Sequence, residues 1–256
     1  MNKILQVKNI NKIYQNQEDE TIALKDITFV IDKGEFVSII GPSGCGKSTL
    51  LSIIAGLETK NTGQIILENK IIDGSSDEIG YMLQKDCLLE WRTVFDNTLF
   101  GLEVKNKKTP ENIKYVEDLL KKYNLYDFKN QYPSELSGGM RQRVALIRTL
   151  ATKPKVLLLD EAFSALDYQT RIMVTNDIYT ILRKEEMTAL IVTHDISEAI
   201  NMSDRVFVLS KRPGTIKHIH KIDFEIENRT PLNCRESPKF SKYFNTLWKE
   251  LGAYEK

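Results

Sequence analysis

A glycine-rich loop between two apolar runs decides the fold, and it reads Gly41-Pro42-Ser43-Gly44-Cys45-Gly46-Lys47-Ser48-Thr49. Residues 36–40 before it are predicted to form a buried strand, and residues 50–56 after it are predicted to form a helix that ends at glycine. Glycines let successive backbone N–H groups turn toward a phosphate without a clash of Cβ atoms. A strand, a glycine loop with Lys-Ser, and a helix, in this order, indicate a phosphate-binding loop.

The residue types in this loop suit a nucleoside triphosphate. The helix that follows places the positive end of its dipole at the loop. Lys47 can reach the β- and γ-phosphates, and the hydroxyl of Ser48 can bind Mg²⁺. A chance glycine-rich turn that contains a lysine is disfavoured by the strand and helix on either side of it.

A second apolar run ends in two carboxylates. Residues 156–159 read Val-Leu-Leu-Leu and are followed by Asp160 and Glu161. Both faces of such a strand must be buried, as in a parallel sheet, and its carboxyl end then lies beside the phosphate loop. We predict that Asp160 holds Mg²⁺ through water and that Glu161 orients and deprotonates an attacking water. Alone, the pair is as well explained as a surface Asp-Glu, and the two motifs do not separate a kinase, a GTPase and an ATPase motor.

Composition and charge limit the remaining classes of protein. The 256 residues include 36 Lys+Arg and 35 Asp+Glu, a net charge of +1, which argues against a large basic surface and a nucleic-acid partner. No apolar run approaches the roughly 20 residues of a membrane span, and the N-terminus lacks the pattern of a signal peptide. Three cysteines form neither a disulfide framework nor a CxxC metal pair. We expect a reduced, cytosolic protein.

Residues 136–143 resemble the signature motif of the ATP-binding subunits of ABC transporters. They read Leu-Ser-Gly-Gly-Met-Arg-Gln-Arg, in which Ser137 is a good N-cap for a helix and the glycine pair bares backbone N–H groups. The resemblance implies that Ser137, Gly138 and Gly139 contact the γ-phosphate of ATP bound by a second copy of the chain. Two ATP molecules are then held in a head-to-tail dimer. An ordinary N-capped helix is the alternative.

Further positions fit the same resemblance. It implies that Gln84 senses Mg²⁺ and the γ-phosphate, that His194 acts as a catalytic switch, and that Tyr14 stacks on adenine. The sequence Ser-Ala-Leu-Asp that ends at Asp167 resembles the loop that crosses the dimer interface. The predicted nucleotide-binding residues are Tyr14, Gly41, Pro42, Ser43, Gly44, Cys45, Gly46, Lys47, Ser48, Thr49, Ser137, Gly138, Gly139 and Asp167. The predicted metal ligands are Ser48, Gln84 and Asp160, and the predicted catalytic residues are Glu161, His194 and Gln84.

The order of the elements predicts an α/β fold. We expect a phosphate-loop, RecA-like core with an N-terminal antiparallel β subdomain and an inserted helical subdomain. Strands are predicted at residues 4–13, 23–31, 36–40 and 64–67, the helical subdomain at about 88–152, the ATP-binding domain at 1–230, and an amphipathic C-terminal helix extension at 231–256. Within the tail, we predict an edge strand over 222–226, a loop over 230–236 and a helix from 237.

Two stretches resemble the importers of nitrate, sulfonates and taurine, namely residues 88–97, which contain a leucine pair and Trp91, and residues 208–216. The likeness to the family runs from residue 5 to about residue 209, and Ala162 and Glu90 stand where relatives have proline. It implies an ATPase subunit that energises uptake of a small anionic solute from the cytoplasmic face of a bacterial membrane. A transmembrane permease and, indirectly, an extracytoplasmic solute-binding protein are its implied partners. The alternatives are an importer of a thiamine-precursor pyrimidine and a non-transport ABC ATPase.

Four residues lead to further hypotheses. Cys45 lies beside Lys47 and a helix N-terminus, both of which favour a thiolate, so we expect a thiol that MgATP protects. We expect Trp91 to lie on the surface that receives the permease, although packing within the helical subdomain is the alternative. His218 and His220 share one face of a strand, but no carboxylate or cysteine lies near them in the sequence, so a metal pair is disfavoured.

Overall fold

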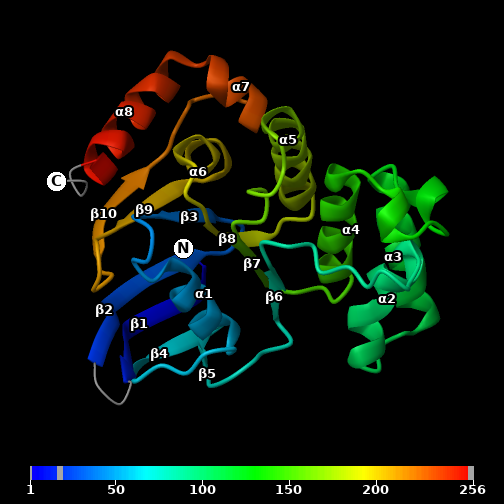
Figure 1. The fold of residues 1–256 in the computed structure, drawn as a ribbon, viewed down its shortest axis with the longest axis horizontal. Helices are drawn as coiled ribbons and strands as arrows, with labels where there is room; N and C mark the ends of the chain where they lie inside the picture. The colour runs from blue at the N-terminus through cyan, green and yellow to red at the C-terminus, as the bar shows by residue number, and fades with distance from the viewer. Residues whose placement is uncertain (1, 16–19, 253–256) are drawn as a thin grey trace.

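Two β-sheets with helices around them form the structure, a computed structural model that describes residues 2–15 and 20–252 (Figure 1). The first sheet is antiparallel, with strand order β2-β1-β4-β5, and the second has the order β10-β9-β3-β8-β7-β6. In the second sheet only β10 runs antiparallel to its neighbour. The predicted phosphate-loop core, antiparallel subdomain and inserted helical subdomain are all confirmed.

The strands are β1 Lys3–Gln15, β2 Glu20–Asp32, β3 Phe36–Ile40, β4 Thr62–Leu67, β5 Lys70–Ile72, β6 Ile79–Met82, β7 Val156–Asp160, β8 Thr188–Val192, β9 Arg205–Leu209 and β10 Ile216–Lys221. The α-helices are α1 Lys47–Ala55, α2 Val94–Val104, α3 Pro110–Lys122, α4 Gly138–Leu150, α5 Tyr168–Lys184, α6 Ile196–Met202, α7 Pro231–Glu236 and α8 Pro238–Gly252. Two short 3₁₀ helices, η1 Tyr126–Phe128 and η2 Pro133–Glu135, precede α4. None of these helices is long and apolar enough to cross a bilayer.

The parallel strands are buried on both faces, as their continuous apolar runs predict. Along β7, Leu157 and Leu159 pack against α4 and α5, whereas Val156 and Leu158 pack toward α1 and the antiparallel sheet. Successive side chains of a strand point to opposite faces, so one short run supplies two cores. This burial fixes the carboxyl ends of β3, β7 and β8 at one edge of the sheet.

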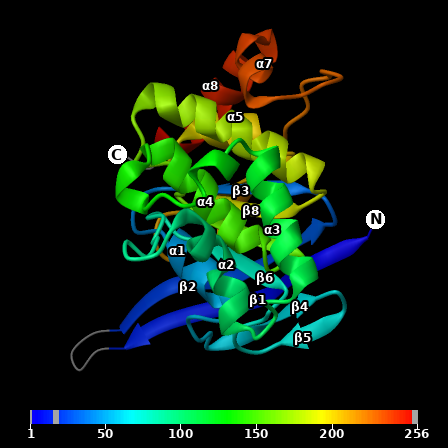
Figure 2. The same ribbon diagram turned by 90° about the vertical axis from the view of Figure 1, so that its right-hand side faces the viewer.

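The inserted helices α2, α3 and α4 lie between β6 and β7 in the chain and stand beside the sheet, on its right in Figure 1 and in front of it in Figure 2. Thr93, Thr109 and Ser137 cap them, and each side-chain oxygen accepts a hydrogen bond from the backbone N–H three residues later. Proline follows Thr109 at the first helical position, as the sequence predicts. The division of the chain at residue 230 stays a prediction.

The tail differs from two of the predictions. Residues 222–226 form no strand, because Ile222 and Phe224 pack beneath α6 and α8 instead of pairing with the sheet. The predicted loop over 230–236 is helix α7, which Thr230 caps reciprocally with Asn233. The predicted final helix is confirmed as α8, and residues 253–256 of the predicted extension lie outside the described residues.

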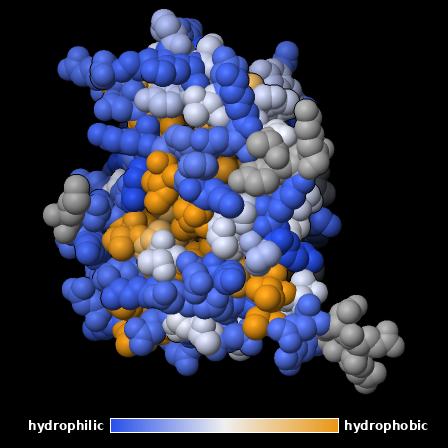
Figure 3. Space-filling view, turned by 90° about the vertical axis from the view of Figure 1, so that its left-hand side faces the viewer, coloured by the Kyte–Doolittle hydropathy of each residue, from blue (hydrophilic) through white to orange (hydrophobic). Residues whose placement is uncertain are grey.

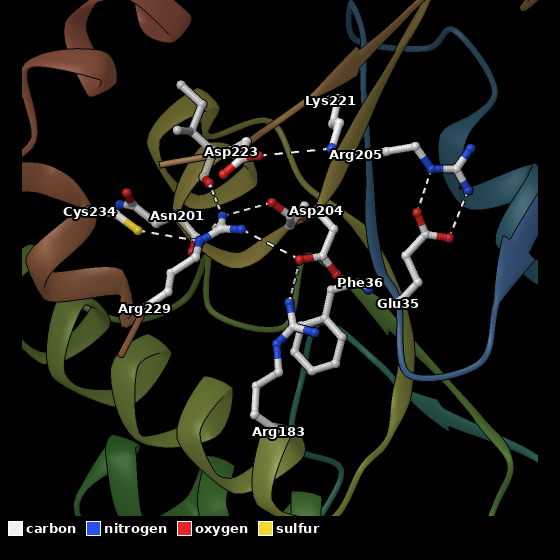
Figure 4. A network of polar contacts seen from close by, with 12 residues as sticks. Glu35, Phe36, Arg183, Asn201, Asp204, Arg205, Lys221, Asp223, Arg229 and Cys234 are labelled. Carbon is white, nitrogen blue, oxygen red and sulfur yellow. Dashed lines mark hydrogen bonds and ion pairs between the residues drawn. The ribbon is translucent and has the colours of Figure 1, made fainter. Parts of the chain in front are cut away.

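One arginine fastens the tail to the core (Figure 4). Arg229 donates hydrogen bonds to the carbonyl oxygens of Ile200 and Ser203 at 2.9 and 2.7 Å, and its Nη1 lies 3.5 Å from Oδ1 of Asp204. Arg183 of α5 donates to the same Asp204 oxygen at 2.7 Å.

The face of the molecule on the left of Figure 1, where α8 and β10 lie, carries apolar residues near its centre (Figure 3).

Candidate nucleotide-binding site

A cavity of about 600 Å³ opens at the carboxyl ends of β3, β7 and β8. Parallel α/β sheets bind ligands at this edge. The cavity brings together most of the predicted phosphate loop with residues from three other segments. Its lining residues are Tyr14, Ala23, Ser43, Gly44, Cys45, Gly46, Lys47, Ser48, Thr49, Glu161, His194 and Arg212.

The loop is tightly built around its glycines. Gly46 has a φ of 104°, and a Cβ atom at this position would lie 2.7 Å from a methyl carbon of Leu24, so only glycine fits. The buried ammonium of Lys47 donates to the carbonyl oxygens of Gly41 and Pro42 at 2.8 and 3.1 Å. Helix α1 begins at Lys47 without a side-chain cap, which leaves its first N–H groups available to an anion.

Asp160 ends β7 beside the loop. Ser48 donates a hydrogen bond to its Oδ1 at 3.1 Å, and Tyr81 donates to its Oδ2 at 3.0 Å. Burial raises the pKa of the Asp160 carboxyl, and these two hydrogen bonds counter that effect. Sequence reasoning missed Tyr81, although a hydroxyl near the carboxyl end of a core strand is the signal that could have found it.

Glu161 stands in the left-handed region with a φ of 46°, which costs a residue other than glycine about 1–3 kcal/mol. Its Oε2 lies 3.3 Å from Nδ1 of His194 and 3.5 Å from Nε2 of Gln84. Gln84 also donates to Oγ of Ser164 at 3.0 Å. The three residues predicted to be catalytic therefore meet around one carboxylate.

The donor atoms at this edge suit a hard divalent cation. Ser48 offers a hydroxyl, Asp160 and Glu161 offer carboxylates, and Gln84 offers an amide oxygen. Mg²⁺ prefers oxygen ligands and is usually bound by one or two carboxylates together with waters and substrate phosphates. The residues present therefore fit Mg²⁺ in the presence of a nucleotide.

Tyr14 of β1 stands at the rim of the cavity. The residue is 38% exposed, and the ammonium of Lys12 lies 4.7 Å from the ring centroid. The hydroxyl of Tyr14 donates to Glu58 at 3.5 Å. This half-exposed ring offers a flat apolar surface at the cavity's edge, of the kind on which a base stacks.

The signature residues and Asp167 do not line this cavity, and they occupy two neighbouring helix N-termini. Ser137 caps α4 and Asp167 caps α5. A Cβ atom on Gly138 would lie 3.1 Å from the side chain of Leu166, and one on Gly139 would lie 2.8 Å from the Val174 side chain. The glycines therefore allow the start of α4 to approach α5 closely.

Arg212 is a cavity residue that sequence reasoning used only for the family resemblance. Its Nη2 donates to the carbonyl oxygen of Gly44 at 3.0 Å, so it contacts the phosphate loop directly. No local pattern marked this residue, because Arg212 lies 168 residues from Gly44 along the chain, although a guanidinium group pairs readily with phosphate. Elsewhere, His220 pairs with Glu250 at 2.9 Å, so a carboxylate does lie near the two histidines. Among the described residues no cluster of three His, Cys, Asp or Glu side chains could hold a metal.

The predicted thiolate at Cys45 is wrong. Its side chain is 1% exposed, and burial raises the pKa of the thiol more than the nearby ammonium of Lys47 lowers it. Proximity to a cation was visible in the sequence, whereas the loss of solvent was not.

Comparison with known proteins identifies relatives across nearly the whole chain. A protein-family model described as ABC transporter matches residues 24–164. The chain is 46% identical to the uncharacterized ABC transporter ATP-binding protein YtlC of Bacillus subtilis, over 98% of this chain and 97% of that protein. It is 39% identical to the nitrate import ATP-binding protein NrtD of Synechocystis sp., over 98% and 96% of the two chains. It is 41% identical to the aliphatic sulfonates import ATP-binding protein SsuB of Bacillus cereus, over 88% and 86%.

A solved structure shares the fold. The ATP-binding cassette MJ0796, determined as a dimer in a post-hydrolysis state with ADP and Pi, superimposes with a TM-score of 0.72. It is 31% identical, and the match covers 86% of this chain and 99% of that one.

Proposed function

The chain belongs to the ABC transporter family and is an ATPase, and we propose that it energises an importer of a small anionic solute. The observation that carries the proposal is the meeting of Gln84, Glu161 and His194 beside the phosphate loop. This arrangement places a base and two polar groups where a water can attack a γ-phosphate.

We propose that Glu161 accepts the proton of the attacking water. His194 and Gln84 hold its carboxylate from two sides, which fixes the direction of proton transfer. Lys47 and the first N–H groups of α1 bind the phosphates. Ser48, Asp160 and Gln84 would hold Mg²⁺, which supplies neutralisation of phosphate charge.

We propose that a second copy of the chain completes each ATP site. The cavity contains the phosphate loop and Glu161 but neither Ser137 nor Asp167. Those residues cap helices that begin side by side, a surface suited to the phosphates held by a partner. A head-to-tail dimer brings each surface to the other copy's cavity, and the dimeric assembly of MJ0796 supports this arrangement.

We propose a transmembrane permease as the other partner, with peripheral attachment at the cytoplasmic face of a bacterial membrane. Trp91 follows the Gln84 segment and is 75% exposed, which supports docking there over packing in the subdomain's own core. An extracytoplasmic solute-binding protein would act indirectly, through the permease.

We propose nitrate, an aliphatic sulfonate or taurine, itself an aliphatic sulfonate, as the solute. The named relatives import nitrate and sulfonates, and they match this chain over most of its length. They favour an anion over a thiamine-precursor pyrimidine and over a non-transport ATPase.

The test begins with the purified chain and MgATP. We expect ATP hydrolysis that depends on Mg²⁺ and on dimer formation, and capture of a polytopic membrane protein from a membrane extract. The captured complex, reconstituted into liposomes, is then assayed with nitrate, taurine, an alkanesulfonate and a pyrimidine. Stimulation of ATPase by the pyrimidine alone, or no captured permease, would contradict the proposed solute or the proposed role.

A further inference from the structure

Two arginines of α4 hold the segment that links Gln84 to Trp91. Arg141 donates from Nε and Nη2 to the two carboxylate oxygens of Asp86, at 2.8 and 3.1 Å. Its Nη2 also donates to Glu90 at 2.7 Å. Arg148, two turns further along α4, donates to the carbonyl oxygens of Asp86 and Cys87, both at 2.6 Å. We name the contacts of Arg141 with Asp86 and Glu90 the clasp.

The far end of the same segment is fastened to α2. The buried amide of Asn97 donates to the carbonyl oxygens of Leu89, Arg92 and Thr93 at 3.0 to 3.1 Å. It also accepts from the N–H of Leu89 at 2.8 Å. The segment is thus held as a rigid piece, with Trp91 exposed at its tip.

The clasp also reaches the residues that precede the signature motif. Nη1 of Arg141 donates to the carbonyl oxygen of Pro133 at 3.1 Å, and the backbone N–H of Arg141 donates to the carbonyl oxygen of Ser137 at 3.0 Å. The side chain of Arg141 therefore contacts a residue just before the signature motif and the segment that follows Gln84, while its backbone belongs to the first turn of the helix that Ser137 caps.

We propose that Arg141 is a positioning residue whose clasp sets the distance between Gln84, which serves the chain's own ATP, and Ser137, which serves its partner's ATP. The inference rests on the proposed function, because it requires two ATP sites shared between two copies. The two ATP sites of the dimer are then coupled within each chain. A partner that binds at Trp91 shifts Gln84 and Ser137 together.

The chemistry of the clasp suits this role. A guanidinium fork binds a carboxylate at two points and so fixes orientation as well as distance, which an ammonium cannot do. Both carboxylate oxygens of Asp86 have partners, because Oδ2 accepts from Nε of Arg141 and Oδ1 accepts from Nη2 of Arg141 and from the N–H of Leu88 at 3.0 Å. Glu90 adds a second carboxylate to the clasp, with its Oε1 2.7 Å from Nη2 of Arg141.

Three conservative substitutions test the clasp: Arg141→Lys, Asp86→Asn and Glu90→Gln. We expect kcat for ATP hydrolysis to fall by about 10- to 100-fold in the first two and less in the third, whose side chain is 54% exposed. The Kd for MgATP, measured in a Glu161→Gln background, should not change because the phosphate loop is untouched. In that background, Asp86→Asn should also weaken the ATP-dependent dimer.

A double-mutant cycle separates positioning from local damage. If Arg141 and Asp86 act only through each other, the double variant loses no more activity than the worse single variant. Glu117→Gln, which removes an ion pair with Lys129 in the same subdomain, is the matched control and should keep wild-type kcat. Additive losses, an unchanged kcat, or a rise in Kd equal to the fall in kcat would overturn the inference. Glu90→Gln changes an exposed carboxylate, so we expect this variant to fold as the unmodified chain does. The test therefore remains valid even if substitutions at Arg141 or Asp86 disturb folding.

The outcomes distinguish this inference from the proposed function. If the unmodified chain neither hydrolyses ATP nor dimerises as Glu161→Gln, the proposed function fails. If it does both, and the clasp variants behave as the unmodified chain does, the clasp inference alone fails.

Discussion

Nδ1 of His194 lies 3.3 Å from Oε2 of Glu161, although the two residues follow different strands. The neighbouring strands β7 and β8 are parallel, so their carboxyl ends bring the two residues together. The left-handed conformation at Glu161 directs its carboxylate to this meeting point. Strain held in place by a buried sheet is typical of a catalytic position.

The first prediction concerns the base. Glu161→Gln should lower kcat by about 10²–10⁴-fold, because the amide cannot accept the proton of the attacking water. MgATP should still bind. The ATP-bound dimer should accumulate because the bound ATP is not hydrolysed. Hydrolysis by phosphate release and assembly by size exclusion measure the two effects. Near-normal turnover would remove Glu161 from the role of base.

The second prediction concerns thiol chemistry. Iodoacetamide should label exposed Cys87 first and Cys45 slowly, because burial raises the pKa of Cys45 and leaves less thiolate at neutral pH. MgATP should slow the labelling of Cys45 further, since this residue lines the cavity. Cys234 is the control, because it is also buried but lies outside the cavity, so MgATP should not change its rate. Peptide mapping that finds Cys45 as reactive as Cys87 would contradict the prediction.

Much of the fold and the site could be predicted, because local patterns encode them. The apolar run before Asp160 and the glycines before Lys47 specify a buried strand and a phosphate loop on their own. The burial of Cys45 and the contact of Arg212 with Gly44 could not be predicted, since burial and pairing depend on segments distant in the chain. The predicted strand over 222–226 was wrong for a related reason. The alternation of Ile222 and Phe224 reflects packing beneath α8 and not pairing at a sheet edge.

The third prediction concerns the tail. Arg229→Ala should lower the free energy of unfolding by about 3 kcal/mol, because it leaves the carbonyl oxygens of Ile200 and Ser203 and the carboxylate of Asp204 without this partner. Lys221→Ala is the control, since its side chain is 81% exposed and its pair with Asp223 should contribute less than about 0.5 kcal/mol. Urea unfolding measures both. Equal effects of the two substitutions would show that Arg229 does not anchor the tail.

The fourth prediction concerns pH. Burial, and then the charge of Asp195, raise the pKa of Glu198 to about 8. The unfolded chain releases this proton near the ordinary glutamate pKa, so between these two values the folded state binds more protons and stability falls as the pH rises. Glu198→Gln should lose less stability than the unmodified chain between about pH 5 and about pH 9. Glu117→Gln is the control, and its stability should depend on pH as that of the unmodified chain does. If the free energy of unfolding falls equally with pH in the unmodified chain, Glu198→Gln and Glu117→Gln, Glu198 is not neutral in the folded state.

The last prediction concerns Trp91, whose side chain stands 75% exposed at the tip of a segment held by Arg148 and Asn97. An exposed tryptophan on a rigid support loses little freedom on binding, so it is suited to anchor a partner. Trp91→Ala should weaken permease binding by about 2 kcal/mol or more, with a melting temperature unchanged because little of the ring is buried. Trp248→Ala removes a 60% exposed tryptophan and should leave permease binding intact. Its helix, α8, lies on the opposite side of the molecule from the inserted helices α2, α3 and α4 (Figure 1). Co-purification and solute uptake measure the loss. A lower melting temperature for Trp91→Ala, or equal losses in both variants, would make Trp91 a structural residue and move the permease surface elsewhere.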